Sequence, residues 1–324
     1  MSVAFRRLLI VGLVLADLLP SAAAHAADKP KEIRIDWATY NPVSLLLRQK
    51  GLLEREFAAD GIAIRWVQTL GSNKALEFLS AGSLDFGSTA GAAALVGKIN
   101  GNPIKSIYVY SRPEWTALVT RKDAAIASIA DLKGKRVAVT RGTDPHIFLV
   151  RALQLAGLTE RDIAPVLLQH ADGKTALIRG DVHAWAGLDP MMAQAEIEDG
   201  ARLFYRNTAA NTWGILNVRG SFLNEHPDLV RRVLATYEEA RKLARSDYGE
   251  LRRVFIAVTR LPGDVVDKQL KERTDLTHNR IGAPQRESIL AAGRALQQAG
   301  VIKPDVDVAA AVDALIDSRV PLTN

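Results

Sequence analysis

Four short polar segments each occupy the point where a predicted strand passes into a predicted helix. They are residues 40–42, 71–73, 88–91 and 142–145, and they combine glycine, proline and short hydroxyl or amide side chains. The first turn of a helix leaves backbone N–H groups unpaired, and the helix dipole favours a negative charge there. Short polar side chains add donors, and glycine lets a ligand approach the backbone. The segments therefore predict capture of a small anion.

These segments supply the first candidates for ligand contact, which are Tyr40, Asn41, Ser72, Asn73, Thr89, Ala90, Gly91, Thr143 and Asp144. The alternative is that their side chains only cap helices. Asp144 followed by Pro145 fits an N-cap and a first helical residue particularly well. If the Asp144 carboxylate faced the ligand instead, it would repel an anion and attract an ammonium or hydroxyl group.

Three tryptophans at or near predicted strand ends are further candidates: Trp115, Trp185 and Trp213. Aromatic rings suit the organic portion of a ligand, although packing in the core explains them equally well. Trp37 and Trp66 lie within strand patterns, so we expect both in the core.

Catalytic and metal-binding patterns are missing from the sequence. The chain has no cysteine, which excludes a thiol nucleophile and thiolate zinc sites. It has no G-x-S-x-G, H-E-x-x-H, Walker or G-x-G-x-x-G motif, and its six histidines are dispersed. We therefore expect no catalytic residue, no metal and no cofactor. An enzyme remains the main rival class of function.

Alternating short strands and helices position these residues. A first set of strands is predicted at 32–38, 62–69, 84–89 and 104–111, and a second at 116–123, 136–142, 164–170, 182–189 and 202–207, followed by 213–220. Helices lie between most of them, including 144–158 and 174–181. Such alternation predicts parallel strand pairing with helices on both faces of the sheets.

The two sets of strands predict two lobes. The chain leaves the first set near residues 112–118 and returns near 213–220, and two crossings of this kind would form a hinge. We assign residues 27–115 and 217–324 to lobe 1 and residues 116–216 to lobe 2. From Asn224 onward the pattern is helical, and we expect these helices to cap lobe 1.

The N-terminus has the pattern of a secretory signal. Arg6 and Arg7 precede an apolar run at 8–19, and Ala24-His25-Ala26 fits the A-x-A cleavage rule. We predict a signal peptide over 1–26 and a periplasmic mature protein; an uncleaved membrane anchor is the alternative. The formal net charge of the chain is +6. The Lys and Arg residues are scattered along the sequence rather than grouped, which does not suggest nucleic-acid binding.

Several longer segments carry a family resemblance. Residues 83–95, 130–158 and 176–196, with 50–66 and 221–234, are similar in order to segments of periplasmic solute-binding proteins of ABC importers, of the aliphatic sulfonate, taurine and nitrate type. The resemblance implies a two-lobed α/β periplasmic-binding-protein fold (type II, Venus flytrap) with a helical C-terminal cap. It also implies a non-enzymatic transport role, with the ligand held in the interlobe cleft.

The same resemblance suggests the ligand and the partners. The ligand would be a small organic anion, an aliphatic sulfonate first of all. Taurine, nitrate, an aromatic carboxylate or a pyrimidine precursor are alternatives, and so is an enzyme on this fold. The partner would be an ABC permease in the inner membrane, to which we expect a monomer to deliver the ligand.

Matches to the family add two further site residues, His146 and Asp189, and also favour Trp185. Support of a loop by His146 and capping of a helix by Asp189 are the alternatives. Two departures imply an altered ligand. Thr89 is followed by Ala-Gly-Ala-Ala where the family often has Gly-Asp-x-Pro, and Asp144 stands where the family often has asparagine.

Overall fold

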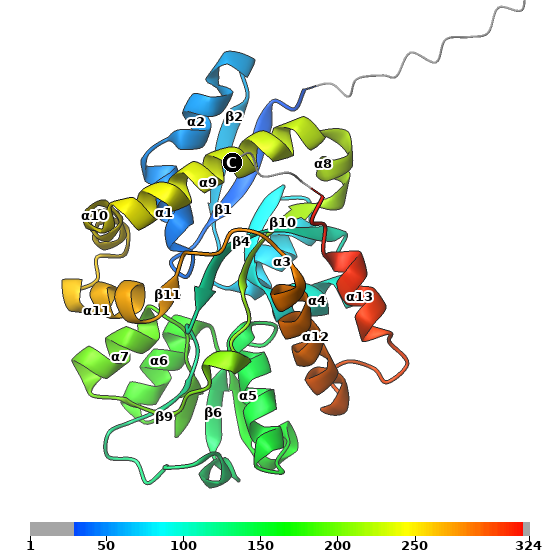
Figure 1. Ribbon diagram of the computed structural model, residues 1–324. Helices are drawn as coiled ribbons and strands as arrows, with labels where there is room; N and C mark the ends of the chain where they lie inside the picture. Colours follow the sequence, from blue (N-terminus) through cyan, green and yellow to red (C-terminus); the bar gives the residue numbers. More distant parts are fainter. Residues whose placement is uncertain (1–28, 320–324) are drawn as a thin grey trace, which may run out of the picture.

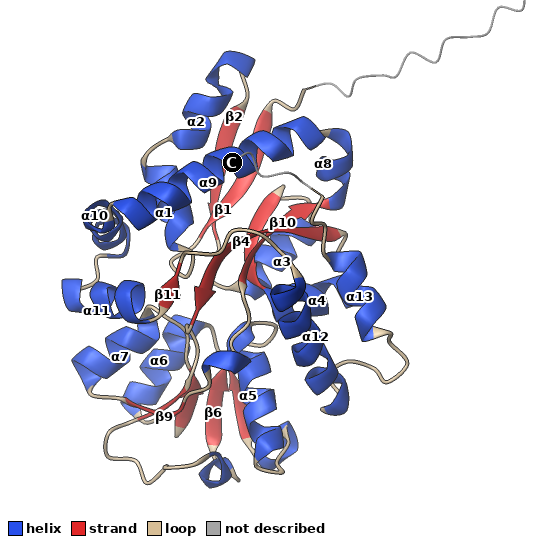
Figure 2. Ribbon diagram, viewed as in Figure 1, coloured by secondary structure: helices blue, strands red, loops and turns tan. Residues whose placement is uncertain are grey.

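The computed structural model describes residues 29–319, which form two lobes, one above the other in Figure 1. The predicted signal peptide, residues 1–26, lies outside these residues. Each lobe contains a β-sheet with helices on both faces, as Figure 2 shows. The prediction of a two-lobed α/β fold is therefore confirmed.

The upper lobe is built on a six-stranded sheet. Its strands are β1 (Glu32–Trp37), β2 (Ala63–Gln68), β3 (Phe86–Ala90), β4 (Ile104–Pro113), β10 (Gly214–Arg219) and β11 (Thr274–Asp275). They follow the order β11-β4-β10-β3-β1-β2. β1 is parallel to β2 and β3, whereas β10 is antiparallel to β3 and β4. β11 is antiparallel to β4.

The lower lobe has a five-stranded sheet. Its strands are β5 (Leu118–Thr120), β6 (Arg136–Val139), β7 (Ala164–Leu167), β8 (Ala184–Ala186) and β9 (Arg202–Tyr205), in the order β7-β6-β8-β5-β9. Alternate side chains of a strand point to opposite faces of a sheet. Accordingly, Val137 and Val139 belong to one apolar cluster, and Ala138 belongs with Trp185 to another on the opposite face.

Helices cover both sheets. They are α1 (Pro42–Gln49), α2 (Leu52–Phe57), α3 (Ser72–Ser80), α4 (Gly91–Ile99), α5 (Asp144–Leu155), α6 (His170–Arg179), α7 (Met191–Asp199), α8 (Gly220–Glu225), α9 (Pro227–Ser246), α10 (Tyr248–Thr259), α11 (Gly263–Asp267), α12 (Ala283–Gln298) and α13 (Val308–Leu315). In the upper lobe, α1, α9 and α10 pack together on one side, and α3, α4, α12 and α13 lie on the other (Figure 1). In the lower lobe, α5 packs opposite α6 and α7.

Two segments connect the lobes. One runs from β4, which ends at Pro113, to β5, and the other runs from β9 to β10. They are hydrogen-bonded to each other, because the Thr116 N–H donates to Asn211 Oδ1 at 2.9 Å. β10 belongs to the upper sheet from Gly214 onward. The exact lobe boundaries, between residues 115 and 116 and between residues 216 and 217, stay a prediction.

Strand direction and one helix start differ from the sequence-based expectation. The sheets are mixed rather than parallel, because β5 and β10 each follow a connecting segment instead of a helical crossover. The strand predicted at 164–170 ends at Leu167, and the helix predicted at 174–181 begins at His170. The Gly173 N–H donates to Gln169 O, which starts the helix earlier than its apolar pattern does.

The C-terminal helices also contact more than the expected lobe. They do pack on the upper lobe, through α1 and α4. In addition, α12 packs against α5 and α11 packs against α7, both in the lower lobe. The C-terminal segment therefore bridges the two lobes.

Candidate functional site

A small cavity lies between the lobes beside the connecting segments. Its volume is about 10 Å³, roughly the space that one water molecule requires. A larger ligand can therefore enter only if the lobes or their side chains move apart. Both lobes line the cavity, with Tyr40, Ser72, Trp115, Thr143, Asp144, Pro145, His170 and Leu188.

The N-termini of three helices meet at this cavity. α3 begins at Ser72, α5 at Asp144 and α6 at His170, and all three residues line the cavity. The first-turn N–H groups and the helix dipoles give this point a positive potential. Among the described residues that line it, none is Lys or Arg. The helix ends are therefore the main attraction that the cavity offers to an anion.

Two aromatic rings form the apolar wall. Tyr40 and Trp115 lie edge to face, with ring centroids 6.0 Å apart. Their polar atoms already have protein partners. The Tyr40 hydroxyl donates to Ser88 O at 3.0 Å, and Trp115 Nε1 donates to Asp144 Oδ2 at 2.8 Å. The rings can therefore contact only the carbon portion of a ligand.

Asp144 connects helix α5 to both connecting segments. Its buried carboxylate accepts hydrogen bonds from Trp115 Nε1, from the Thr212 N–H at 3.0 Å and from Thr212 Oγ1 at 2.6 Å. Burial raises the pKa of Asp144, and these donors oppose that shift. The expected N-cap role is wrong, because Thr143 is the N-cap and Asp144 is the first helical residue. Asp144 instead holds the α5 N-terminus against the hinge.

The two hydroxyl groups at the cavity differ in what they can donate. Thr143 Oγ1 donates to Thr140 O at 2.6 Å, so its proton is engaged within the loop. Ser72 Oγ accepts from the Ala90 N–H at 3.0 Å. Within residues 29–319, the Ser72 proton has no acceptor, and it can be offered to a ligand.

Sequence reasoning missed His170, which is 2% exposed and lines the cavity. Thr140 Oγ1 donates to Leu168 O at 2.7 Å and also contacts His170 Nδ1 at 3.2 Å. Because the single Thr140 proton goes to Leu168, Nδ1 must carry the proton of the imidazole. Burial lowers the pKa of His170 to about 3, so the ring is neutral and its Nε2 is an acceptor.

His170 could have been found from its local sequence. It follows a predicted strand and precedes a helix, as do the four segments that are predicted to bind an anion. The strand expected at 164–170 includes Gln169 and His170, so the sequence pattern does not indicate a strand-to-helix junction at His170. In the structure the strand ends at Leu167 and the helix begins at His170.

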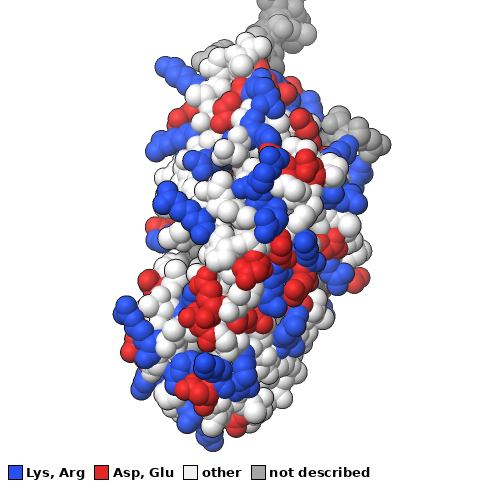
Figure 3. Space-filling view, turned by 90° about the vertical axis from the view of Figure 1, so that its left-hand side faces the viewer, with Lys and Arg blue, Asp and Glu red and all other residues white. Residues whose placement is uncertain are grey.

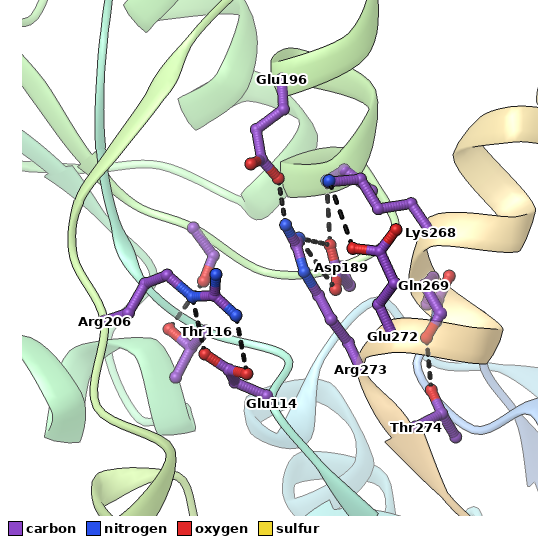
Figure 4. A network of polar contacts seen from close by, with 12 residues as sticks. Glu114, Thr116, Asp189, Glu196, Arg206, Lys268, Gln269, Glu272, Arg273 and Thr274 are labelled. Atoms are coloured by element: carbon purple, nitrogen blue, oxygen red, sulfur yellow. Dashed lines mark hydrogen bonds and ion pairs between the residues drawn. The ribbon is translucent and has the colours of Figure 1, made fainter.

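A buried ion-pair network joins the lobes on another side of the hinge (Figure 4). Arg273, between α11 and β11, donates to both carboxylate oxygens of Asp189, at 3.1 and 3.4 Å, and to Glu196 of α7. Burial raises the pKa of Asp189 to about 6, and Arg273 opposes that shift. Asp189 Oδ1 also accepts from the Ala193 N–H at 2.9 Å, so it supports the start of α7.

A larger groove of about 900 Å³ is lined by residues of α4 and α12 of the upper lobe and of α5 of the lower lobe. His146 lies there, and its Nε2 is 3.1 Å from Glu160 Oε1. The hydrogen bond to His146 lowers the pKa of Glu160. His146 therefore faces the groove and Glu160, and it does not line the small cavity.

On the face in Figure 3, basic and acidic side chains are interspersed, with more basic than acidic ones over the upper part. No helix in residues 29–319 is long and apolar enough to cross a membrane. The same residues contain no cluster of three or more His, Asp or Glu side chains arranged to hold a metal.

Comparison with known proteins identifies the family. The family model described as "NMT1/THI5 like" matches residues 56–247. A protein of Escherichia coli that is named as an aliphatic sulfonates-binding protein is 30% identical over 278 residues, which cover 85% of this chain and 86% of that protein. The chain belongs to the NMT1/THI5-like family.

Solved structures of sulfonate-binding proteins have the same fold. The alkanesulfonate-binding protein SsuA of Xanthomonas axonopodis pv. citri, bound to MOPS, superposes with a TM-score of 0.80 at 27% identity, covering 88% of this chain and 99% of that one. The periplasmic aliphatic sulphonate binding protein SsuA of Escherichia coli superposes with a TM-score of 0.76 at 26% identity, covering 91% and 95%. This NMT1/THI5-like chain thus has the periplasmic-binding-protein fold.

The structure gathers some predicted site residues at the cavity and places others elsewhere. Tyr40, Ser72, Trp115, Thr143 and Asp144 line it, and Asn73 follows Ser72. The predicted residues that do not line it are Asn41, Thr89, Ala90, Gly91, His146, Trp185, Asp189 and Trp213. Their contact with a ligand stays a prediction.

Most residues of this second group already have partners in the fold. Asn41 caps α1 by accepting from the Ser44 N–H, and Thr89 Oγ1 accepts from Asn217 Nδ2 at 2.8 Å. The Gly91 N–H donates to Trp213 O at 2.9 Å. Trp185 is fully buried in the lower lobe. Trp213 lies edge to face with His278, at 4.8 Å between ring centroids.

Proposed function

We propose that this protein is the solute-binding component of an ABC importer and captures an aliphatic sulfonate between its lobes. The observation that carries the proposal is the meeting of three helix N-termini from both lobes at one cavity. A sulfonate has three oxygens that can accept from such N–H groups. The names of the two SsuA relatives support the same ligand class.

The mechanism is closure on the ligand. With the lobes apart, the ligand first meets the α3 N-terminus and Ser72 of the upper lobe. Closure then brings up the N-termini of α5 and α6 from the lower lobe. Because these contacts exist only in the closed form, ligand binding shifts the population toward it. The carbon portion of the ligand lies against Tyr40 and Trp115.

The remaining features of the proposal concern the setting of the protein. The mature chain acts as a monomer in the periplasm after removal of residues 1–26, and its closed form docks on an inner-membrane permease. It has no catalytic activity. The absence of cysteine from the chain argues against an enzyme that needs a thiol nucleophile.

Calorimetry on the mature chain, residues 27–324, tests the proposal. Titration with alkanesulfonates should give saturable binding of one ligand per chain without turnover. Ser72→Ala should weaken it because the free hydroxyl donor is lost, whereas Ser246→Ala, at an exposed position at the end of α9, should not. Binding of nitrate, an aromatic carboxylate or a pyrimidine in place of sulfonates would overturn the ligand class. Failure to bind any of these solutes would overturn the binding role.

A further inference from the structure

Helix α12 is fixed to the upper lobe. Gly91, at the start of α4, and Gly293, within α12, let the two helices approach each other closely. An added methyl group on Gly91 would lie 2.8 Å from Ile289, and one on Gly293 would lie 2.6 Å from Leu95. Packing as close as this leaves little room for α12 to shift against α4. A contact between α12 and the lower lobe therefore depends on how the two lobes are placed.

Helix α5 of the lower lobe presents an apolar stripe to the upper lobe. Ile147 and Val150 are 2% and 3% exposed, and both belong to the apolar cluster that upper-lobe residues such as Leu296 of α12 form. Phe148 and Leu149 of the same helix belong instead to a cluster of the lower lobe. Ile147 and Val150 are therefore buried by the other lobe, and separation of the lobes would expose them to water.

A hydrogen bond between the lobes lies beside this stripe. Gln154, one turn after Val150, donates from Nε2 to Ala295 O of α12 at 3.0 Å. Ala295 is in the last turn of α12, where the negative end of the helix dipole favours a donor. The α5–α12 contact consists of this hydrogen bond and of the apolar packing of Ile147 and Val150 against the upper lobe.

The α5–α12 contact lies between the hinge and the groove of about 900 Å³. On the hinge side of α5, Arg151 Nη1 donates to Ala210 O of a connecting segment at 3.0 Å. Successive residues turn about 100° around the helix axis, so Gln154 follows next to Arg151, and His146 lies farther round and faces the groove. Opening of the lobes about the connecting segments would therefore break the α5–α12 contact and widen the groove.

We propose that the α5–α12 contact is a latch that does not touch the ligand and that sets the equilibrium between open and closed lobes. Val150 and Gln154 are then positioning residues for ligand capture, although neither lines the small cavity. The inference goes beyond the proposed function and rests on its closure step. A ligand that needs the closed form binds with an apparent affinity that depends on the population of this form. The latch therefore changes the affinity for every such ligand by the same factor.

Distances between two spin labels test the latch without any ligand. The chain has no cysteine, so Asn100→Cys and Arg161→Cys place single labels at exposed positions on opposite sides of the groove. Val150→Asp adds a charge to the α5–α12 contact, and the cost of burying this charge is relieved when the lobes part. Double electron–electron resonance on the labelled mature chain should therefore show a longer distance in Val150→Asp.

A matched control uses the same substitution on the same helix. Leu155, near the end of α5, is 72% exposed, so Leu155→Asp buries no charge and should leave the distance between the labels unchanged. An unchanged distance in Val150→Asp, with the circular dichroism of a folded protein, would overturn the inference. If Val150→Asp does not fold, Gln154→Ala takes its place, and a longer or an unchanged distance then decides in the same way.

Calorimetry with methanesulfonate and ethanesulfonate gives the second readout. Gln154→Ala removes one hydrogen bond between the lobes, so both affinities should fall by the same factor, about fivefold, and their ratio should stay that of the wild type. Leu155→Ala should keep both affinities. A loss for one ligand alone, or for neither, would overturn the inference. Binding of no sulfonate would overturn the proposed ligand class, and the distances between the labels would still decide whether the latch exists.

Discussion

Removal of Arg273 should destabilise the protein strongly, because it leaves a carboxylate buried between the lobes without its cation. The side chains of Arg273 and Asp189 are 2% and 1% exposed, and that of Glu196 is 20% exposed. Breaking a buried ion pair from one side costs about 3–5 kcal/mol, most of it from the charge left behind. We therefore expect Arg273→Met to lower the free energy of unfolding by about 3–5 kcal/mol.

A double-mutant cycle separates charge from packing. In Arg273→Met/Asp189→Asn the abandoned charge is gone, so at least about half of the loss should be recovered. Asp189→Asn alone should cost less than Arg273→Met, because Arg273 keeps Glu196 as a partner. Urea unfolding at pH 7.5, followed by circular dichroism, measures all four proteins.

Two results would refute this reasoning. The first is a free energy of unfolding of Arg273→Met within about 1 kcal/mol of that of the wild type. A loss this small is typical of exposed ion pairs, and it would mean that water reaches the network. If the double variant were as unstable as Arg273→Met, lost packing of the long arginine side chain would be the cause, not the unpaired charge.

Two other changes test the upper lobe. Burial raises the pKa of Asp36 to about 6 from 3.8, so its contribution to stability is present below about pH 4 and is lost as the pH rises through 6. Urea unfolding at pH 4–7 should show a wild-type decrease of at most about 3 kcal/mol from this group, and Asp36→Asn should lack it. Gly214→Ala should lower the free energy of unfolding by about 1–3 kcal/mol in the same assay, because its methyl group would lie 2.4 Å from the buried Tyr110 ring. The control Gly249→Ala, whose nearest neighbour would be 3.4 Å away, should show no such loss.

The sequence by itself determined the two lobes and most of their elements. Apolar residues alternate with period two in strands and recur with helical period between them, and this pattern depends only on local geometry. The presence of Ser72 and Thr143 at the cavity was also predictable, since both are short polar residues at strand-to-helix junctions. The mixed strand directions were not predictable in this way, because periodicity carries no information about the direction of a neighbouring strand.

Only the tertiary structure decided which of the candidate residues meet. Thr89 and Trp185 lie near predicted strand ends, as Ser72 and Trp115 do. In the fold, however, Thr89 and Trp185 are buried inside the lobes, whereas Ser72 and Trp115 line the cavity. His170 lines the cavity because the N-terminus of α6 lies near that of α3, although Ser72 and His170 are 98 residues apart in the sequence. In the same way, Asp144 accepts a hydrogen bond from Thr212, which lies in a connecting segment distant in the sequence. Contacts between distant segments depend on how whole lobes pack, and no local spacing of residues specifies that packing.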